Sequence, residues 1–262
     1  MKNIIIENKR FEHVKTRLHS SVSIYKGPDC YMRIGPIDLI KKELLTHSKL
    51  LEYNFSIAKI LKEGEKDNQY FYIEESLGNE VLGVSFCKDF NEKNVLSKKE
   101  FDKFMNITKD FTKTQIGTIG KAQISTIDFF HGIQLDTLFN EKPNLKKEVT
   151  TAFEKIKNRL IHFPEVFTQG DFNPHNFFSK GIIDFDSSFS APIGYDQITA
   201  IFHTYSFPNQ GIAEISRGYV FSEEQEKYYL DSINEIFINE GLPKLSNFID
   251  DFLFVRLVWS VV

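Results

Sequence analysis

The stretch TQGDFNPHNFFSKGIIDFD, residues 168–186, is the part of the sequence that most constrains the fold. It places Asp171, Asn176 and Asp184 next to short runs of apolar, β-branched or aromatic residues. Such runs, separated by Ser-Lys-Gly at 179–181, predict two short strands joined by a turn. The polar residues then fall at strand ends, on neighbouring loops of one small sheet, so we expect their side chains to converge on a single point.

The convergent residues have the chemistry of a magnesium site. Two carboxylates and an amide oxygen are hard ligands, and protein-bound Mg²⁺ typically keeps several waters and takes further ligands from phosphates. Taken singly, Asp171 would serve equally well in an Asx-turn and Asn176 as a loop cap. The coincidence of several residue types at fixed spacing favours a functional site over these local roles.

The composition excludes several classes of protein. A chain of 262 residues, 41% of them hydrophobic, suffices for one large domain or for two lobes. A net charge of −4 gives no overall positive field for binding nucleic acid. The two cysteines, Cys30 and Cys87, make neither a disulfide framework nor a zinc site by themselves. No stretch resembles a signal peptide or a membrane span, so we expect a cytoplasmic protein that binds neither membranes nor nucleic acid.

The first 77 residues predict short strands around one helix. The segment VSIYKGPDCYMRIG has the pattern of a hairpin with its turn at 27–29, and Pro36 is suited to the N1 position of a following helix. The runs FSIAKIL, residues 55–61, and QYFYIEESLG, residues 69–78, are expected to complete the strands. The apolar pattern ends at 77–79, which predicts a boundary between two lobes.

The rest of the chain, residues 78–262, predicts mostly helices. Capping-box patterns at 97–100 and 222–225 mark two helix starts. Gly241 is placed as the C′ residue of the second of these helices, and a further helix is expected at 194–206.

The motif Gln-Gly-Asp-Phe-Asn-Pro-His-Asn followed by Ile-Ile-Asp-Phe-Asp resembles the catalytic loop and metal-binding motif of the aminoglycoside phosphotransferase and choline kinase family, which has a protein-kinase-like fold. The specific part is the D-x-x-x-x-N spacing from Asp171 to Asn176, with Asp184 after a short hairpin. In kinases the loop Asp orients or deprotonates the acceptor hydroxyl, and the Asn and second Asp hold Mg²⁺ on the nucleotide phosphates. The resemblance therefore implies Asp171 as the catalytic base and Asn176 and Asp184 as metal ligands. The segment at 194–196 is similar to the one that opens the family's next helix, where its Asp is structural.

The sequence departs from the family pattern at the loop and in the first lobe. Gln169 stands where the family usually has His, and glutamine forms hydrogen bonds but carries no charge. The segment YMRIGP resembles a variant with arginine at the position of the nucleotide lysine. Arg33 is thus our candidate for the phosphates, with Glu43 as its partner on the helix; an ordinary surface ion pair explains these two residues equally well.

No G-x-G-x-x-G motif is present to cover the nucleotide. The small polar residues Ser20, Ser21 and Ser23 are candidates to cradle phosphate through backbone N–H groups. Glu75 and Leu77, at the end of the predicted lobe, are candidate contacts for the adenine.

Together these features predict an α+β protein with a two-lobed protein-kinase-like fold. Residues 1–77 would form a small, β-rich nucleotide-binding lobe with one main helix, and residues 78–262 a larger, mostly helical catalytic and substrate lobe. The implied activity is Mg²⁺-dependent transfer of the γ-phosphate of ATP to a hydroxyl of a small molecule of the aminoglycoside, amino alcohol or sugar type. The choice between ATP and GTP, and the oligomeric state, stay open at this stage.

The main alternative is a catalytically silent relative that binds a nucleotide or a partner as a regulatory module. Gln169 and the missing glycine-rich loop favour that alternative. Phosphorylation of proteins is disfavoured, because no D-F-G followed by A-P-E frames an activation segment.

Overall fold

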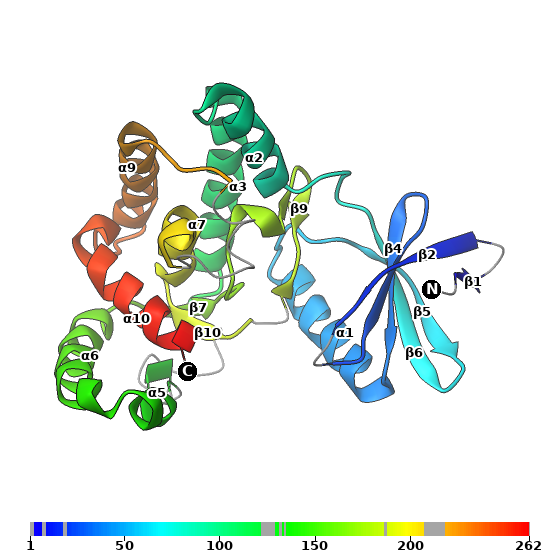
Figure 1. Cartoon of the computed structure of the whole chain (residues 1–262), viewed down its shortest axis with the longest axis horizontal. Helices are drawn as coiled ribbons and strands as arrows, with labels where there is room; N and C mark the ends of the chain where they lie inside the picture. The colour runs from blue at the N-terminus through cyan, green and yellow to red at the C-terminus, as the bar shows by residue number, and fades with distance from the viewer. Residues whose placement is uncertain are drawn as a thin grey trace. The chain divides into compact units, whose positions relative to one another are not determined.

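The computed structural model describes residues 3–6, 9–17, 20–121, 129–130, 133, 135–185, 188–206 and 218–261 (Figure 1). The chain divides into two compact units. The N-terminal unit comprises Met1–Asn79 with Phe178–Ile183, and the C-terminal unit comprises Glu80–Phe177 with Asp184–Val262. The N-terminal unit thus includes a segment from far along the chain, which a single boundary between residues 77 and 78 leaves out. The nucleotide-binding and catalytic roles expected for the two lobes stay predictions.

The N-terminal unit is built on a six-stranded antiparallel sheet with the strand order β1-β2-β3-β4-β6-β5. The hairpin turn predicted at 27–29 is confirmed, because Gly27 N donates to Cys30 O at 2.8 Å. The helix expected after it is also present, although Pro36 is its N-cap rather than its first helical residue. The elements are β1 (Ile4–Ile6), β2 (Lys9–Thr16), β3 (Ser23–Lys26), β4 (Cys30–Gly35), α1 (Ile37–Glu52), β5 (Ile60–Lys66) and β6 (Gln69–Glu75).

The strand expected at 55–61 is wrong, since β5 begins only at Ile60. Asp67 and Asn68, with φ of 51° and 62°, form a two-residue turn that sets the register of β5 against β6. The apolar residues before β5 include Phe55 and Ile57, which are buried in irregular backbone. Their hydrophobicity reflects burial of a loop rather than pairing in the sheet.

The sheet of the N-terminal unit has an apolar side chain cluster on each face. Because successive side chains of a strand point to opposite faces, Met32 and Ile34 join one cluster, while Arg33 points to the face where α1 packs. On that second face Val22, Ile40 and Tyr72 form the buried cluster. Figure 1 shows α1 lying along this sheet. Strand alternation thus places the side chain of Arg33 on the same face of the sheet as α1, the helix that contains its predicted partner Glu43.

The C-terminal unit is mostly helical, as expected, and the helix predicted at 194–206 is confirmed as α7. None of the described helices has the length and apolar character needed to span a bilayer. The helices are α2 (Leu82–Lys93), α3 (Lys98–Ile116), α5 (Leu135–Glu141), α6 (Lys146–Leu160), α7 (Tyr195–Ser206), α9 (Glu223–Asn239) and α10 (Ile249–Val261), with 3₁₀ turns η1 (Pro143–Leu145), η2 (Pro174–Asn176) and η4 (Leu245–Phe248).

The strands around the motif do not form one small sheet, so that expectation is wrong. Strand β7 (Glu165–Phe167) pairs with β10 (Ser190–Pro192), while β8 (Phe177–Phe178) pairs with β9 (Gly181–Ile182) in a separate hairpin. Strands β7 and β8 are separated by residues 168–176, which include the 3₁₀ turn η2. Apart from Phe177, the hairpin belongs to the N-terminal unit, where Ile182 N donates to Ser56 O at 2.8 Å.

The two predicted capping boxes have different outcomes. The box at the start of α9 is confirmed: Ser222 Oγ accepts from Gln225 N at 3.2 Å, and Gln225 Oε1 accepts from Ser222 N at 3.0 Å. At the start of α3 the predicted helix start is confirmed, with Ser97 as the N-cap, but the capping box is wrong, because the side chain of Ser97 makes no capping hydrogen bond. Asp89 from α2 accepts from Ser97 N at 2.6 Å instead, so a carboxylate from another helix satisfies the backbone there.

Aromatic side chains make up much of the core of the C-terminal unit. Phe104 of α3 lies with its ring centroid 5.1 to 6.2 Å from those of five other aromatic residues. Phe172 and Phe177 extend this core to the loop between β7 and β8, because Phe172 stacks on Phe111 at 4.1 Å and contacts Phe177 at 4.5 Å. Both ends of the Asp171–Asn176 segment are thus anchored by buried rings.

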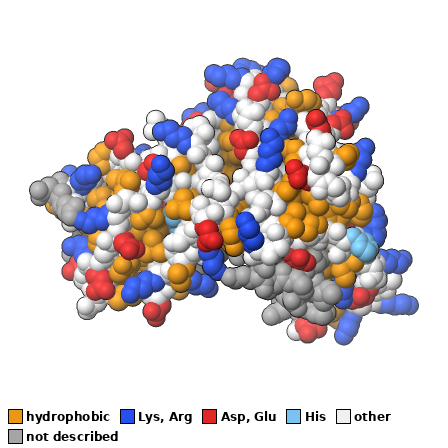
Figure 2. Space-filling model, turned by 180° about the vertical axis from the view of Figure 1, so that it is seen from behind, with side chains coloured by type: hydrophobic (Ala, Val, Ile, Leu, Met, Phe, Trp, Pro, Cys, Tyr) orange, Lys and Arg blue, Asp and Glu red, His pale blue; other side chains and the backbone are white. Residues whose placement is uncertain are grey.

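On the face shown in Figure 2, acidic and basic side chains are interspersed among the residues drawn in colour. This distribution agrees with the small net charge of the chain, −4.

Candidate active site

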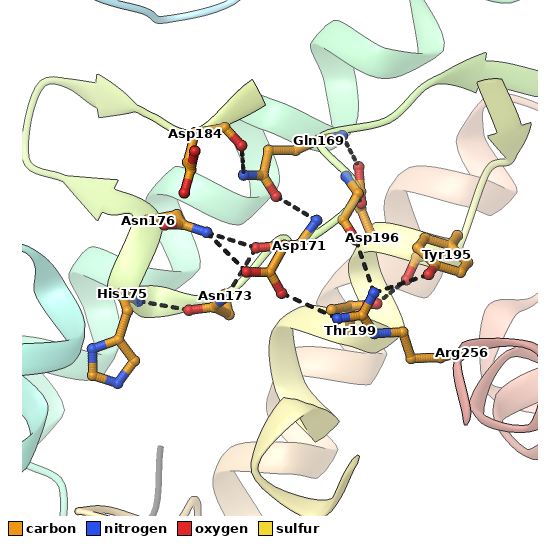
Figure 3. A network of polar contacts seen from close by, with 11 residues as sticks. Gln169, Asp171, Asn173, His175, Asn176, Asp184, Tyr195, Asp196, Thr199 and Arg256 are labelled. Atoms are coloured by element: carbon orange, nitrogen blue, oxygen red, sulfur yellow. Dashed lines mark hydrogen bonds and ion pairs between the residues drawn. The ribbon is translucent and has the colours of Figure 1, made fainter. Parts of the chain in front are cut away.

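The loop between β7 and β8 folds back on the main chain of Asp171. Asn173 caps the short turn η2, with its Oδ1 accepting from His175 N at 2.9 Å. The Nδ2 atoms of Asn173 and Asn176 both donate to Asp171 O, each at 2.9 Å. Figure 3 shows these contacts converging on one peptide. The D-x-x-x-x-N spacing therefore brings its two end residues into direct contact.

The carboxylate of Asp171 is held from two sides. Its Oδ2 lies 3.3 Å from Asn176 Nδ2, and its Oδ1 accepts from Arg256 NH2 at 3.1 Å (Figure 3). The side chain is nevertheless 46% exposed. A carboxylate fixed in orientation and open to solvent is what a group that receives a proton from a bound hydroxyl requires.

Asp184 is joined to this loop through Gln169. Gln169 Nε2 donates to Asp184 O at 2.7 Å, and the side chain of Asp184 points toward Asn176 in Figure 3. The backbone of Asp184 is left-handed, with φ of 64°. Non-glycine residues adopt this conformation infrequently, and such residues cluster at functional sites. The structure thus brings Asp171 and Asn176 into contact and places Asp184 beside them.

The side chains of Asn176 and Asp184 fit a magnesium ion. Since Asn176 directs its Nδ2 hydrogens at Asp171, its Oδ1 is the atom left to act as a ligand. Together with the Asp184 carboxylate it supplies hard oxygen donors of the type that Mg²⁺ prefers. Within the described part of the chain, no group of three or more His, Cys, Asp or Glu side chains has the arrangement of a metal site.

Gln169 links the two halves of the motif without using charge. Its Oε1 accepts from Asp171 N at 2.8 Å while its Nε2 donates to Asp184 O at 2.7 Å. A side-chain amide can donate and accept at the same time, as a neutral histidine can through its two ring nitrogens. The residue that departs from the family pattern therefore anchors the loop.

We expect Gln169→Leu to lower the free energy of unfolding by about 1–3 kcal/mol, because a partly buried N–H of Asp171 and a partly buried C=O of Asp184 lose these hydrogen bonds while the side-chain volume is kept. Urea denaturation followed by circular dichroism measures the change. The matched control is Gln69→Leu, an exposed glutamine at the start of β6, whose effect should stay within about 0.5 kcal/mol. Equal stability of the two variants would show that the hydrogen bonds of Gln169 to Asp171 and Asp184 do not stabilise the fold.

Asp196 supports the start of the loop from the first turn of α7, in line with its expected structural role. Its Oδ2 accepts from Gln169 N and from Gln115 Nε2, both at 2.8 Å, and its Oδ1 accepts from Gly170 N at 3.1 Å. Complete burial raises the pKa of Asp196 to about 7, while these three donors act in the opposite direction. The backbone before Asp171 is thereby fixed to two helices of the C-terminal unit.

Sequence reasoning missed Arg256, which lies in α10. Its NH1 donates to Gly170 O at 2.9 Å and to Tyr195 Oη at 3.0 Å, in addition to the contact of NH2 with Asp171. One signal was available: Arg256 is the single charged residue of the apolar segment FLFVRLVWSVV. Arginine in such a segment is rarely buried unless it is paired.

In the N-terminal unit, the structure gives Arg33 a different principal partner from the one predicted. Arg33 Nε donates to Glu74 Oε1 at 3.0 Å, whereas its NH1 lies 3.8 Å from Glu43 Oε2. Glu43 instead accepts from Arg17 NH1 and Tyr72 Oη, each at 3.0 Å. Burial raises the pKa of Tyr72, so this phenol stays a donor. The predicted pair is present as one contact in a larger network.

The three serines predicted to cradle phosphate lie at the β2–β3 connection. Ser20 Oγ is buried without a hydrogen-bond partner among the described residues, and Ser21 has a left-handed backbone with φ of 54°. Ser23 lies in β3, where its hydroxyl is 2.8 Å from that of Thr16. Ser20 and Ser21 thus lie in the connection between β2 and β3, and Ser23 is the first residue of β3.

The two predicted adenine contacts lie at the end of β6. Glu75 Oε1 accepts from Lys59 N at 3.1 Å. Leu77 is buried, and a Cβ added at Gly181 would lie 3.2 Å from its Cδ1. The side chain of Leu77 therefore packs against the β8–β9 hairpin.

Known structures share this architecture. An aminoglycoside-3'-phosphotransferase of type VIII superposes with a TM-score of 0.55 at 10% identity, covering 98% of this chain and 95% of that one. The aminoglycoside phosphotransferase APH(3'')-Id from Streptomyces rimosus, in complex with ADP and streptomycin, gives 0.53 at 10% identity over 95% of this chain and 92% of that one. The chain has the protein-kinase-like fold of the aminoglycoside phosphotransferases.

A further structure with this fold is the gentamicin complex of APH(2'')-IIa, with a TM-score of 0.50 at 12% identity, covering 95% of this chain and 88% of that one. No protein-family model and no curated protein matches the sequence. The likeness therefore confirms the fold class expected from the motif, and the roles of individual residues stay predictions.

Proposed function

We propose that the protein is a Mg²⁺- and ATP-dependent phosphotransferase that moves the γ-phosphate to a hydroxyl group of a small molecule. The observation that carries the proposal is the geometry of the loop: Asn176 contacts both the main chain and the carboxylate of Asp171, and Gln169 ties Asp171 to Asp184. Kinases use this combination of one loop Asp, one loop Asn and a second Asp for phosphoryl transfer.

Asp171 is the proposed catalytic residue. It would accept a hydrogen bond from the acceptor hydroxyl and orient its oxygen toward the γ-phosphorus. A new bond forms from that oxygen to phosphorus while the bond from phosphorus to the β,γ-bridging oxygen breaks. The hydroxyl proton passes to the Asp171 carboxylate, and ADP leaves with the electron pair of the broken bond. Exposure of 46% leaves this carboxylate accessible to such an acceptor.

Asn176 and Asp184 are the proposed metal ligands. A bound Mg²⁺ would neutralise charge on the phosphates, with its remaining ligands supplied by phosphate oxygens and water. In the N-terminal unit, Arg33 is proposed to contact phosphate and Glu43 to hold it, and the remaining predicted nucleotide contacts are Ser20, Ser21, Ser23, Glu75 and Leu77.

The similar structures support the nature of both substrates. One of them holds ADP with streptomycin and another holds gentamicin, so nucleotides and hydroxyl-bearing small molecules bind to proteins of this fold. We extend this to the present chain and propose ATP as donor and a hydroxylated small molecule as acceptor, acting in the cytoplasm.

One observation favours the second candidate, a silent regulatory relative. Arg33, the cation proposed for the phosphates, already pairs with the carboxylate of Glu74 at 3.0 Å. Both side chains are 12% exposed, so a nucleotide would have to compete with a partly desolvated partner. In this candidate the fold would bind a partner or a nucleotide without turnover.

Calorimetric titration with ATP, in the presence and absence of Mg²⁺, tests the proposed function without any assumption about the acceptor. We expect binding that requires Mg²⁺, followed by ADP formation when hydroxylated small molecules are screened. Binding without ADP formation for any acceptor or for water would favour the silent relative. Absence of binding with or without Mg²⁺ would overturn the phosphotransferase proposal.

A further inference from the structure

The guanidinium of Arg256 contacts two consecutive residues of the candidate catalytic loop. NH1 donates to Gly170 O at 2.9 Å and NH2 donates to Asp171 Oδ1 at 3.1 Å, while NH1 also meets Tyr195 Oη at 3.0 Å. Figure 3 shows the side chain approaching Asp171 from the side opposite Asn176. The two nitrogens of one planar group thus hold the peptide before Asp171 and its carboxylate together.

The guanidinium of Arg256 contacts the loop from a buried position on α10. Arg256 is 7% exposed, and its neighbours on α10 include the buried side chains of Phe252, Val255 and Val258. A buried cation is costly unless it is paired, and an apolar side chain of similar volume at such a position is often neutral or stabilising. Stability alone therefore does not account for an arginine here.

The chemistry of the guanidinium matches the two acceptors. Its planar fork offers donors on adjacent nitrogens, whereas the ammonium of lysine is a compact point charge on a flexible stem. With Oδ1 on Arg256 and Oδ2 near Asn176, rotation of the Asp171 carboxylate is restricted at both oxygens. The lone pairs left for an acceptor hydroxyl then have one fixed direction.

We propose that Arg256 is a positioning residue that fixes the Asp171 carboxylate, and with it the acceptor hydroxyl, from helix α10. This inference rests on the proposed phosphotransferase function. It adds a residue 85 positions from Asp171 in the sequence to the three that the motif supplies. Arg256 acts through Asp171 and does not itself touch a substrate.

The test uses Arg256→Met, which keeps the length and the apolar stem, and Arg256→Lys, which keeps the charge. The probe is Mg²⁺-ATP, with affinity measured by calorimetry and turnover measured as ADP formation with water as acceptor. We expect Arg256→Met to lower kcat about 10- to 100-fold while the Kd for Mg²⁺-ATP changes less than about twofold, because misorientation affects the reaction rather than nucleotide binding. Arg256→Lys should recover part of the lost kcat.

Two further variants separate positioning from a general structural effect. In an Asp171→Asn background, Arg256→Met should cause no additional loss of kcat, because the two residues act as one unit. The matched control is Arg159→Met, since Arg159 of α6 pairs with Asp251 of α10 at 3.2 Å and does not contact the loop. Its kcat should equal that of the wild type.

The outcomes distinguish this inference from the function on which it rests. Wild-type protein that forms ADP, with unchanged kcat in both Arg256→Met and Arg256→Lys, would overturn the positioning role and leave the function standing. Losses that simply add in the double variant would also overturn it. Wild-type protein that does not bind Mg²⁺-ATP would overturn the proposed function. If Arg256→Met fails to fold, the kcat of Arg256→Lys is compared with that of Arg159→Met. A lower kcat in Arg256→Lys alone supports the positioning role, and equal values overturn it.

Discussion

We expect Asp171→Asn to lower phosphate transfer about 10²- to 10⁴-fold, while the Kd for Mg²⁺-ATP stays within about twofold of the wild-type value. Asparagine has nearly the same shape, and its single side-chain oxygen can still accept from Arg256, while its NH2 group replaces the oxygen that faces Asn176. It cannot take the proton of the acceptor hydroxyl, so the loss reports proton transfer and orientation of the nucleophile. ADP formation with a screened acceptor measures the rate, and calorimetry measures nucleotide affinity.

The control for this prediction is Asp110→Asn, an exposed aspartate on α3 for which we expect wild-type turnover. Asp171→Ala supplies a second variant that removes both acceptor oxygens and should be at least as slow. If Asp171→Asn keeps wild-type turnover, Asp171 is not the catalytic residue and the loop needs another role.

The sequence predicts this loop well because its geometry is local. Asn173 caps the turn η2 two residues later, and Asn176 reaches back five residues to Asp171. Contacts over such short separations leave a fixed spacing in the sequence, which is why the motif predicted the approach of Asp171 and Asn176. The aromatic residues at 172 and 177 complete the pattern by anchoring both ends in the core.

The supports of the loop were harder to predict because they come from distant helices. Gln115 reaches Asp196 across 81 positions, and Arg256 reaches Gly170 across 86. Neither residue belongs to a motif, so only the packing of α3, α7 and α10 reveals their partners. A polar residue in an apolar helix indicates that a buried partner exists, and the sequence does not say which one.

The error at β5 has a related cause. The apolar run at 55–61 has the hydrophobicity of a strand, but the true strand, Ile60–Lys66, consists mostly of charged residues, alternates between exposed and partly buried side chains, and lies at an edge of the sheet. The prediction for Arg33 also omitted its main partner, Glu74. Glu74 follows two positions after Tyr72 on β6, so its side chain lies on the same face of the sheet as those of Tyr72 and Arg33. That alternation would have identified Glu74 as a rival of Glu43.

We expect Asp184→Asn to raise the Kd for ATP in the presence of Mg²⁺ at least about tenfold, since even indirect supports of a metal ligand typically cost 10- to 100-fold in affinity. Binding measured without Mg²⁺ should be unchanged. Asparagine is the appropriate substitution because Asp184 has φ of 64°, a conformation that asparagine tolerates and alanine does not. The change therefore removes the charge without straining the backbone.

The matched control is Asp67→Asn, because Asp67 has the same left-handed backbone, with φ of 51°, in the exposed β5–β6 turn. Its nucleotide affinity and its Mg²⁺ dependence should equal those of the wild type. Titration of each variant with ATP at several Mg²⁺ concentrations gives the affinity for the metal–nucleotide complex. An Asp184→Asn variant that keeps the full Mg²⁺ dependence would exclude Asp184 as a ligand, and would leave Asn176 without the carboxylate that the magnesium proposal requires beside it.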